Sequence, residues 1–169
     1  SIMVLGGTAA GKTTALNALT CLIKPGSKTI TIEETAELNL PLENWVSLIA
    51  RQSYGLGGSS VGEVSLFDLV KATVRHLPAI LVVGEVRGQE AYVLFQALAT
   101  GHGGMCTMHA ENLDSAVKRL TQKPMDISPA YIPLMNIVLS IQRVHLVKGT
   151  EKKAYRRVMN SNEIADYED

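Results

Sequence analysis

Short apolar runs alternate with longer amphipathic stretches along this chain, a pattern typical of strands and helices that follow one another in an α/β fold. Apolar or β-branched runs predict strands over residues 2–5, 29–32, 79–83, 105–108 and 137–147. A turn at 148–151 leads into residues 154–159, which are expected to pair antiparallel with the last of these strands. The pattern therefore predicts a mostly parallel sheet that ends in a C-terminal antiparallel hairpin.

Apolar residues at helical spacing fill most of the intervals between these strands. The predicted helices cover residues 15–23, 66–77, 91–98 and 113–120. Ser65 is the expected N-cap of the second helix and Pro78 its stop. Residues 38–62 show no such period and are expected to be irregular, with a mobile glycine-rich segment at 54–62. Residues 1–169 are expected to form one domain.

The most specific motif stands between the first strand and the first helix. Residues 6–13 read Gly-Gly-Thr-Ala-Ala-Gly-Lys-Thr and match the phosphate-binding loop G-x-x-x-x-G-K-[ST]. The glycines let backbone N–H groups curl around phosphates, Lys12 reaches the outer phosphates, and the Thr13 hydroxyl binds Mg²⁺. The residues expected to bind the nucleotide are Gly6, Gly7, Thr8, Ala9, Ala10, Gly11, Lys12, Thr13 and Thr14.

Carboxylates follow two of the predicted strands. Glu33 and Glu34 end the second strand, Glu37 comes three residues later, and Glu85 follows the apolar run 79–83. Ligands of open α/β sheets bind outside the carboxyl ends of the strands, where such residues hold Mg²⁺ or polarise an attacking water. A solvated strand end or the first turn of a helix is the more common explanation of such carboxylates when they are taken alone. Glu85 is harder to explain by packing, because it ends a buried strand.

Histidines and arginines add further candidates with open alternatives. His109 ends the strand 105–108 and is placed to donate a hydrogen bond to the outermost phosphate. A zinc site with His102 is disfavoured. Arg51 is either a phosphate sensor or an exposed structural residue. Arg75 suits the negative end of its helix. Basic residues at 152–153 and 156–157 suggest nucleic-acid contact, but a charged edge strand explains them more simply.

Composition narrows the class of protein only a little. The 169 residues include 16 basic and 16 acidic side chains, so no global field favours nucleic acid or an anionic membrane. The two cysteines, Cys21 and Cys106, stand far apart, which fits a reducing compartment. No apolar run approaches the length of a membrane span. The chain opens just before the phosphate-binding loop, so a further domain is expected upstream.

Four motifs occur in a specific order. The loop is followed by the acidic box at residues 32–37, by Gly-Glu-Val-Arg at 84–87, and by the histidine segments at 100–102 and 109–110. This set resembles the secretion ATPase superfamily, the motors of type II secretion, type IV pili, archaella and type IV secretion. The resemblance covers roughly residues 2–121. It implies a RecA-type P-loop NTPase and a C-terminal motor domain whose N-terminal domain is absent from this chain.

The resemblance also implies roles for the candidate residues. Glu34, Glu37, Glu85 and His109 would be catalytic, and Thr13, Glu33 and Glu85 would bind the metal. Arginines acting across a subunit boundary are expected among Arg51, Arg75 and Arg87, with His102 as the second histidine. The implied cofactors are ATP and Mg²⁺. The implied partners are five further copies in a hexamer and an inner-membrane platform protein, with no nucleic acid, at the cytoplasmic face of the membrane.

Some positions depart from the bacterial pattern and favour an archaeal-like variant. The acidic box reads Glu-Glu-Thr rather than Glu-Asp-Pro, and Gly88 stands where an Asp is frequent. The leading hypothesis is Mg²⁺-dependent ATP hydrolysis that powers a secretion, pilus or archaellum motor. The alternatives are a DNA translocase of conjugation type and, with less support, a small-molecule P-loop kinase.

Overall fold

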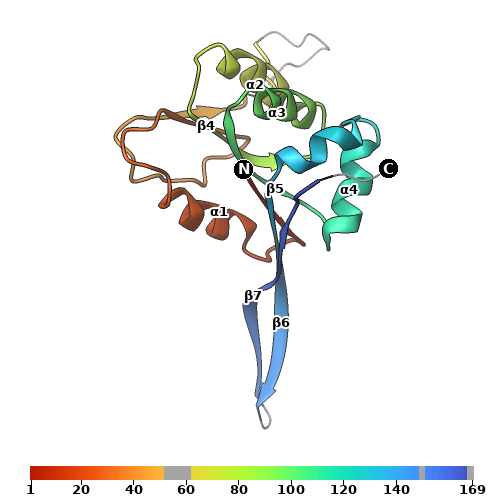
Figure 1. Ribbon diagram of the computed structural model, residues 1–169. Helices are drawn as coiled ribbons and strands as arrows, with labels where there is room; N and C mark the ends of the chain where they lie inside the picture. Colours follow the sequence, from red (N-terminus) through yellow and green to blue (C-terminus); the bar gives the residue numbers. More distant parts are fainter. Residues whose placement is uncertain (52–61, 149–150, 167–169) are drawn as a thin grey trace, which may run out of the picture.

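The computed structural model describes residues 1–51, 62–148 and 151–166, and these form a twisted sheet with helices on both faces (Figure 1). The sheet has seven strands within the described residues, in the order β3-β2-β4-β5-β1-β6-β7. All neighbours pair in parallel except β6 and β7. The strands are β1 Ile2–Gly6, β2 Thr29–Glu33, β3 Trp45–Ile49, β4 Ile80–Val86, β5 Gly103–Met108, β6 Ile137–Lys148 and β7 Glu151–Glu163. The expected α/β architecture with its C-terminal hairpin is confirmed.

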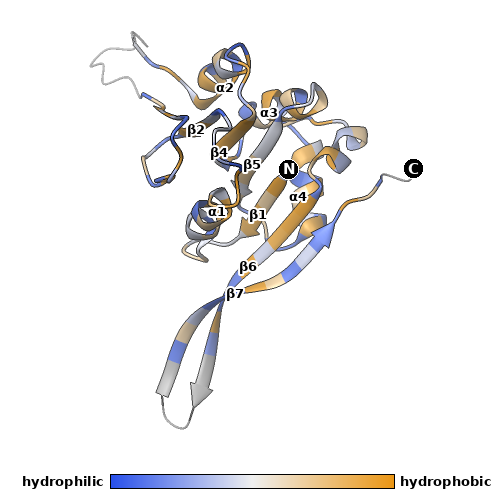
Figure 2. Ribbon diagram, turned by 60° about the vertical axis from the view of Figure 1, so that its left-hand side comes forward, coloured by the Kyte–Doolittle hydropathy of each residue, from blue (hydrophilic) through white to orange (hydrophobic). Residues whose placement is uncertain are grey.

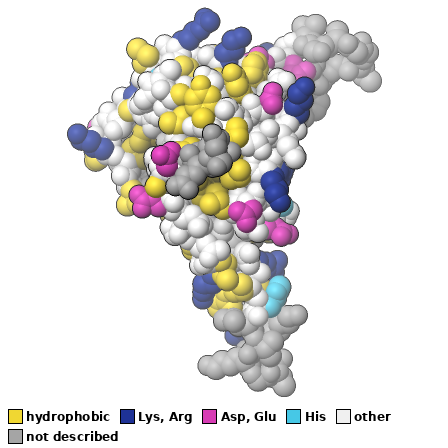
Figure 3. Space-filling model, turned by 45° about the vertical axis from the view of Figure 1, so that its right-hand side comes forward, with side chains coloured by type: hydrophobic (Ala, Val, Ile, Leu, Met, Phe, Trp, Pro, Cys, Tyr) yellow, Lys and Arg dark blue, Asp and Glu magenta, His cyan; other side chains and the backbone are white. Residues whose placement is uncertain are grey.

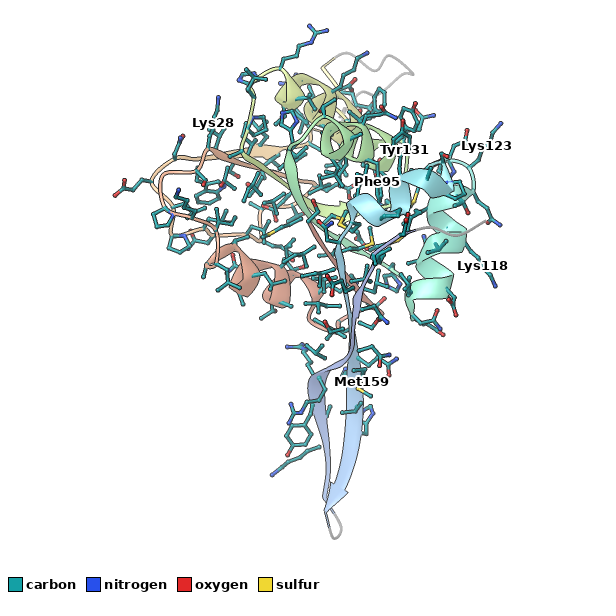
Figure 4. All side chains as sticks on the ribbon, viewed as in Figure 1. Lys28, Phe95, Lys118, Lys123, Tyr131 and Met159 are labelled. Carbon is teal, nitrogen blue, oxygen red and sulfur yellow. The ribbon has the colours of Figure 1, made fainter. Side chains whose placement is uncertain are left out.

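The helices divide between the two faces of the sheet. They are α1 Lys12–Thr20, α2 Leu66–Val74, α3 Glu90–Ala99 and α4 Leu113–Thr121, followed by the 3-10 helix η1 Pro129–Leu134. On one face, α2, α3, α4 and η1 bury a large apolar core, with Phe95 of α3 at its centre (Figure 4). On the other face, α1 packs through Leu16, which is fully buried. No helix in the described residues is long and apolar enough to cross a membrane.

One segment differs from the expectation. β3, Trp45–Ile49, lies inside the interval predicted to be irregular, so that prediction is wrong for these residues. The strand pairs in parallel with β2, and the Trp45 indole donates a hydrogen bond to the Thr31 hydroxyl. The expected N-cap at Ser65 is confirmed, because Ser65 and Asp68 form a reciprocal capping box. Residues 54–61 of the glycine-rich segment lie outside the described residues.

The parallel strands bring their carboxyl ends to one edge of the sheet, and the hairpin leaves the body at this edge. β1 and β6 stay paired as far as Gly6 and Ile141, after which β7 is the only neighbour of β6 among the described strands. Beyond this point β6 reads Gln142-Arg143-Val144-His145, so the apolar colour of its part in the body gives way to mainly polar residues (Figure 2). The basic residues of β7 therefore lie on an edge strand, as the simpler explanation of their charge predicted.

Candidate active site

The phosphate-binding loop joins β1 to α1 with the backbone geometry that its motif requires. Gly11 is the N-cap of α1 and has a φ of 98°, a left-handed conformation that favours glycine. Helix α1 begins at Lys12, so the backbone N–H groups of its first turn have no partner within the helix and are free to bind an anion. The Lys12 ammonium donates a hydrogen bond to the Gly7 carbonyl oxygen, 3.1 Å away. The loop thus presents N–H groups and a lysine to an anion.

The first glycine of the loop is required by packing against β6. A Cβ at Gly6 would lie 2.6 Å from the backbone oxygen of Ile141 and 3.1 Å from the Ala10 Cβ. A Cβ at Gly7 would meet nothing within 4 Å. The shape of the loop therefore depends on a strand that comes much later in the chain.

Glu33 lies at the carboxyl end of β2 and is almost completely buried, with 3% of its surface exposed. Its Oε1 accepts hydrogen bonds from the backbone N–H groups of Glu37 and Leu38, each at 3.1 Å. Its Oε2 is buried and has no hydrogen-bond partner within the described residues. Burial raises the pKa of Glu33, and the two backbone hydrogen bonds only partly offset this. A buried, half-satisfied carboxylate is costly unless a ligand completes it.

Gly84 makes room for this carboxylate. A Cβ at Gly84 would lie 3.0 Å from the Glu33 Cγ, so any side chain here would displace Glu33. The carbonyl of Gly84 accepts a hydrogen bond of 2.7 Å from the Thr107 hydroxyl of β5. A glycine is therefore needed at position 84 because the Glu33 side chain lies against the β4 backbone there.

These side chains line one cleft of about 300 Å³ beside the phosphate-binding loop. Lys12 and Thr13 come from α1, Glu33, Glu34 and Glu37 from β2 and the segment after it, and Glu85 and Arg87 from β4 and its end. The cleft is lined by Lys12, Thr13, Glu33, Glu34, Thr35, Glu37, Leu66, Gly84, Glu85, Arg87 and Thr107. The structure therefore brings the loop lysine and all four carboxylates of the sequence analysis together.

A second, larger cavity of about 1130 Å³ adjoins this cleft and shares Glu34 and Arg87 with it. The Arg87 guanidinium forms an ion pair with the Glu34 carboxylate, and both side chains are about half exposed. Arg51 also lines this cavity, and its Nε donates to the Gly62 carbonyl. Two of the three candidate arginines, Arg51 and Arg87, thus line the larger cavity.

Glu90 is a positioning residue that the sequence analysis did not single out. Its carboxylate is buried at the start of α3 and accepts hydrogen bonds from the N–H groups of Arg87 and Gly88. A Cβ at Gly88 would lie 2.9 Å from the Glu90 Oε2, which explains the glycine at this position. Glu90 therefore fixes the turn that carries Arg87.

His109 and His102 lie at opposite ends of β5. The Nε2 of His109 lies 2.9 Å from the Thr8 hydroxyl, so this histidine contacts the phosphate-binding loop itself. His102 precedes the strand and contacts the Ala97 carbonyl through Nδ1. A six-residue strand separates the two by roughly 20 Å. Arg75 caps the carboxyl end of α2 and, like His102, does not line the cleft.

The residues of the cleft fit a magnesium ion that is shared with phosphates. In the part of the chain that the structure describes, no group of three or more His, Cys, Asp or Glu side chains is arranged to hold a metal by itself. Magnesium in nucleotide sites uses one or two protein oxygens, and phosphates and waters supply the rest. The buried, unpartnered Glu33 Oε2 and the Thr13 side chain in the same cleft suit such an ion.

A parallel sheet with a glycine-rich loop and lysine at the first helix, and with carboxylates on adjacent strand ends, defines a P-loop nucleotide-binding domain. Comparison with known families gives a narrower answer. The chain belongs to the family described as Type II/IV secretion system protein, whose model matches residues 1–166. The resemblance to the secretion and pilus motor ATPases is thus confirmed.

Relatives and solved structures agree with this membership. The chain is 40% identical over 168 residues to the protein MJ1287 of Methanocaldococcus jannaschii, covering 99% of this chain and 60% of that protein. It is 37% identical over 161 residues to the type IV secretion system protein PtlH of Bordetella pertussis, covering 91% and 46%. The chain thus spans about half the length of these relatives.

Two solved structures share the fold. The VirB11 ATPase of the Brucella suis type IV secretion system, in complex with sulphate, superposes with a TM-score of 0.74 at 25% identity, covering 96% of this chain and 49% of that one. The pilus retraction motor PilT with bound ADP gives a TM-score of 0.65 at 22% identity, covering 94% and 47%. The expected P-loop ATPase fold is confirmed.

Proposed function

We propose that this chain binds ATP with Mg²⁺ and hydrolyses it, as the motor domain of a secretion or pilus assembly machine. The observation that carries the proposal is the meeting of Lys12 and Thr13 with Glu33 and Glu85 in one cleft. Family membership supports it, as do the ADP bound to PilT and the sulphate bound to VirB11.

The phosphate-binding loop and α1 would hold the nucleotide through its phosphates. The backbone N–H groups of the loop and the positive end of the α1 dipole favour the anion. Lys12 would place its charge at the outer phosphates. Thr13, Glu33 and Glu85 would hold Mg²⁺, which supplies charge neutralisation at the transferred phosphate.

The carboxylates would prepare water for in-line attack on the outermost phosphate. Glu85 lies on β4 beside the loop and would orient the water and accept its proton. Glu34 and Glu37 would support this role from the β2 side. His109, held at Thr8, would donate a hydrogen bond to the phosphate from the β5 side.

The exposure of Glu34 and Arg87 suits a site that a neighbouring subunit completes. We therefore extend the proposal to a hexameric ring in which arginines act across subunit boundaries, with Arg51, Arg75 and Arg87 as candidates and His102 near the boundary. The motor would work at the cytoplasmic face of the membrane on a platform protein of its machine, together with an N-terminal domain that covers the nucleotide.

Two substitutions test the site. Lys12→Ala is expected to abolish ATP binding, whereas Glu85→Gln is expected to retain binding and lose turnover. Binding is measured by titration with a fluorescent ATP analogue and turnover by phosphate release. Matched controls are Lys24→Ala and Glu111→Gln, because Lys24 and Glu111 are exposed and outside the cleft. Full hydrolysis by the Glu85→Gln protein would contradict the role of Glu85.

The oligomeric mass tests the assembly. Light scattering in the presence of nucleotide should give six subunits for a chain extended to the length of its relatives. A monomer under these conditions would contradict the ring while leaving nucleotide binding intact.

A further inference from the structure

Arg156 of the hairpin lies against the phosphate-binding loop. Its Nε donates a hydrogen bond of 3.1 Å to the backbone oxygen of Ala9. Its Cδ packs beside Gly11, so closely that a Cβ on Gly11 would lie only 2.9 Å away. The contact joins the second strand of the hairpin to a loop near the other end of the sequence.

The pairing register of β6 with β1 and β7 places Arg156 beside the phosphate-binding loop. β6 is paired to β1 as far as Ile141, which opposes Val158 of β7, and Met159 is the extra residue of a bulge there. Met159 marks the point where the hairpin leaves the body (Figure 4). Arg156 lies just beyond this point and opposes Arg143 across the ladder. The space-filling view shows Lys and Arg side chains along this part of the molecule (Figure 3).

Most of the hydrogen-bonding capacity of the Arg156 guanidinium is unused. Its Nε donates to Ala9, and neither Nη atom makes a hydrogen bond to any side chain that the structure describes, which leaves out those of residues 52–61, 146–152 and 167–169. The side chain is also exposed. The adjacent Arg157 differs, because its guanidinium lies 5.0 Å from the Tyr155 ring centre and its Nη1 donates to a backbone carbonyl. Arg156 is therefore held at the loop with a free cationic fork.

The order of the strands indicates which part of a nucleotide this fork would meet. The carboxylates come from β2 and β4, on one side of β1, whereas β6 and β7 lie on the other side. A nucleotide whose outermost phosphate faces the carboxylates must direct its inner phosphate and ribose toward β6 and β7. Arg156, next to Gly11 at the start of α1, lies on that inner side.

We propose that Arg156 is a nucleotide-binding residue that forms an ionic contact with the innermost phosphate of the bound nucleoside di- or triphosphate. The inference rests on the proposed function, because it needs a nucleotide in the loop. Guanidinium groups match phosphate oxygens with two parallel hydrogen bonds. A shared contact to the inner phosphate stabilises ATP and ADP equally.

The test compares dissociation constants of ATP and ADP for the wild type, Arg156→Lys and Arg156→Gln, with Arg157→Gln as the matched control. Arg156→Gln is expected to weaken both nucleotides by roughly ten- to a hundredfold, the size of a hydrogen bond to a charged group. Arg156→Lys should recover part of the loss because it keeps the charge. The loss should shrink as salt is added, and the control should bind as the wild type does.

Each other outcome overturns the inference. Unchanged binding by Arg156→Gln would mean that only the hydrogen bond to Ala9 matters, since glutamine keeps a donor. A loss for ATP alone would place the arginine at the outermost phosphate, and an equal loss in Arg157→Gln would make the effect one of general charge. Absence of nucleotide binding by the wild type would instead remove the proposed function itself.

Discussion

The imidazole of His109 and the hydroxyl of Thr8 lie 2.9 Å apart, which ties the carboxyl end of β5 to the phosphate-binding loop. The backbone oxygen of His109 is held in turn by the Arg119 guanidinium of α4. These two contacts hold His109 against the loop, which supports its proposed hydrogen bond to the outermost phosphate.

Replacement of His109 by alanine should therefore slow turnover more than it weakens binding. We expect a fall in kcat of about a hundredfold, the effect of losing one donor to a developing charge. The ATP dissociation constant should rise less than about tenfold, since only one hydrogen bond to the loop is lost. Steady-state phosphate release and nucleotide titration measure the two effects. His145→Ala, on the exposed part of β6, is the matched control, and an unchanged kcat in His109→Ala would refute the role.

Substitutions at the two adjacent glycines of the loop should differ sharply in their effect on the free energy of unfolding. Gly6→Ala places a Cβ 2.6 Å from the Ile141 oxygen, whereas Gly7→Ala finds open space. We expect Gly6→Ala to lose about 2 kcal/mol or more of folding free energy through overpacking, and Gly7→Ala to lose little. Denaturant unfolding without nucleotide compares them. Equal stability of both variants would show that β6 does not constrain the loop.

Burial of Glu33 predicts a pH dependence of stability. Its pKa is raised from the ordinary value of 4.5, mainly by loss of solvation, so its ionisation opposes folding. The stability that the protonated form contributes is present below about pH 4.5 and is lost as the pH rises through the raised pKa. Glu33→Gln should therefore gain stability relative to the wild type as the pH rises above about 4.5.

Melting temperatures across this range measure the difference between the two proteins. Glu111→Gln, at an exposed carboxylate, is the control and should track the wild type at every pH. A constant difference between Glu33→Gln and the wild type would contradict the burial argument.

The two cysteines should react with thiol reagents at very different rates. Cys21 is exposed, whereas Cys106 is buried in β5 and its pKa is raised to about 12 by burial. The thiolate is the reactive form of cysteine. With Ellman's reagent, one thiol per chain should therefore react quickly in the native protein and two in the denatured protein. Rapid reaction of Cys106 in the native state would show that the core around β5 opens.

Most of the sheet could be predicted from the sequence, because the central strands are continuous apolar runs. β3 was not predicted, because it is an edge strand whose Val46 and Ile49 are exposed. It pairs in parallel with β2, so no tight turn in the sequence marks the pairing. Periodicity carries no information on such a pairing.

In the candidate site, the direction of the strands determines which of the predicted residues lie close together. Glu33, Glu85 and His109 all follow strands, and the carboxyl ends of parallel strands meet at one edge. His102 precedes its strand and lies at the other end, a distinction that strand direction alone could have made. Arg156 was assigned only to an edge strand, because its contact with Ala9 spans 147 positions and depends on the bulge in the hairpin.

The contact between Gly6 and the Ile141 backbone has a consequence for how this domain can be divided. Every recognisable motif lies before residue 122, yet one wall of the phosphate-binding loop is β6, which begins at Ile137. A chain cut after α4 would keep all four sequence motifs but would lose β6, the strand against which the phosphate-binding loop packs. The phosphate-binding loop lies between the first strand and the late strand β6, so the ATP affinity proposed for it would report whether β1 and β6 have paired.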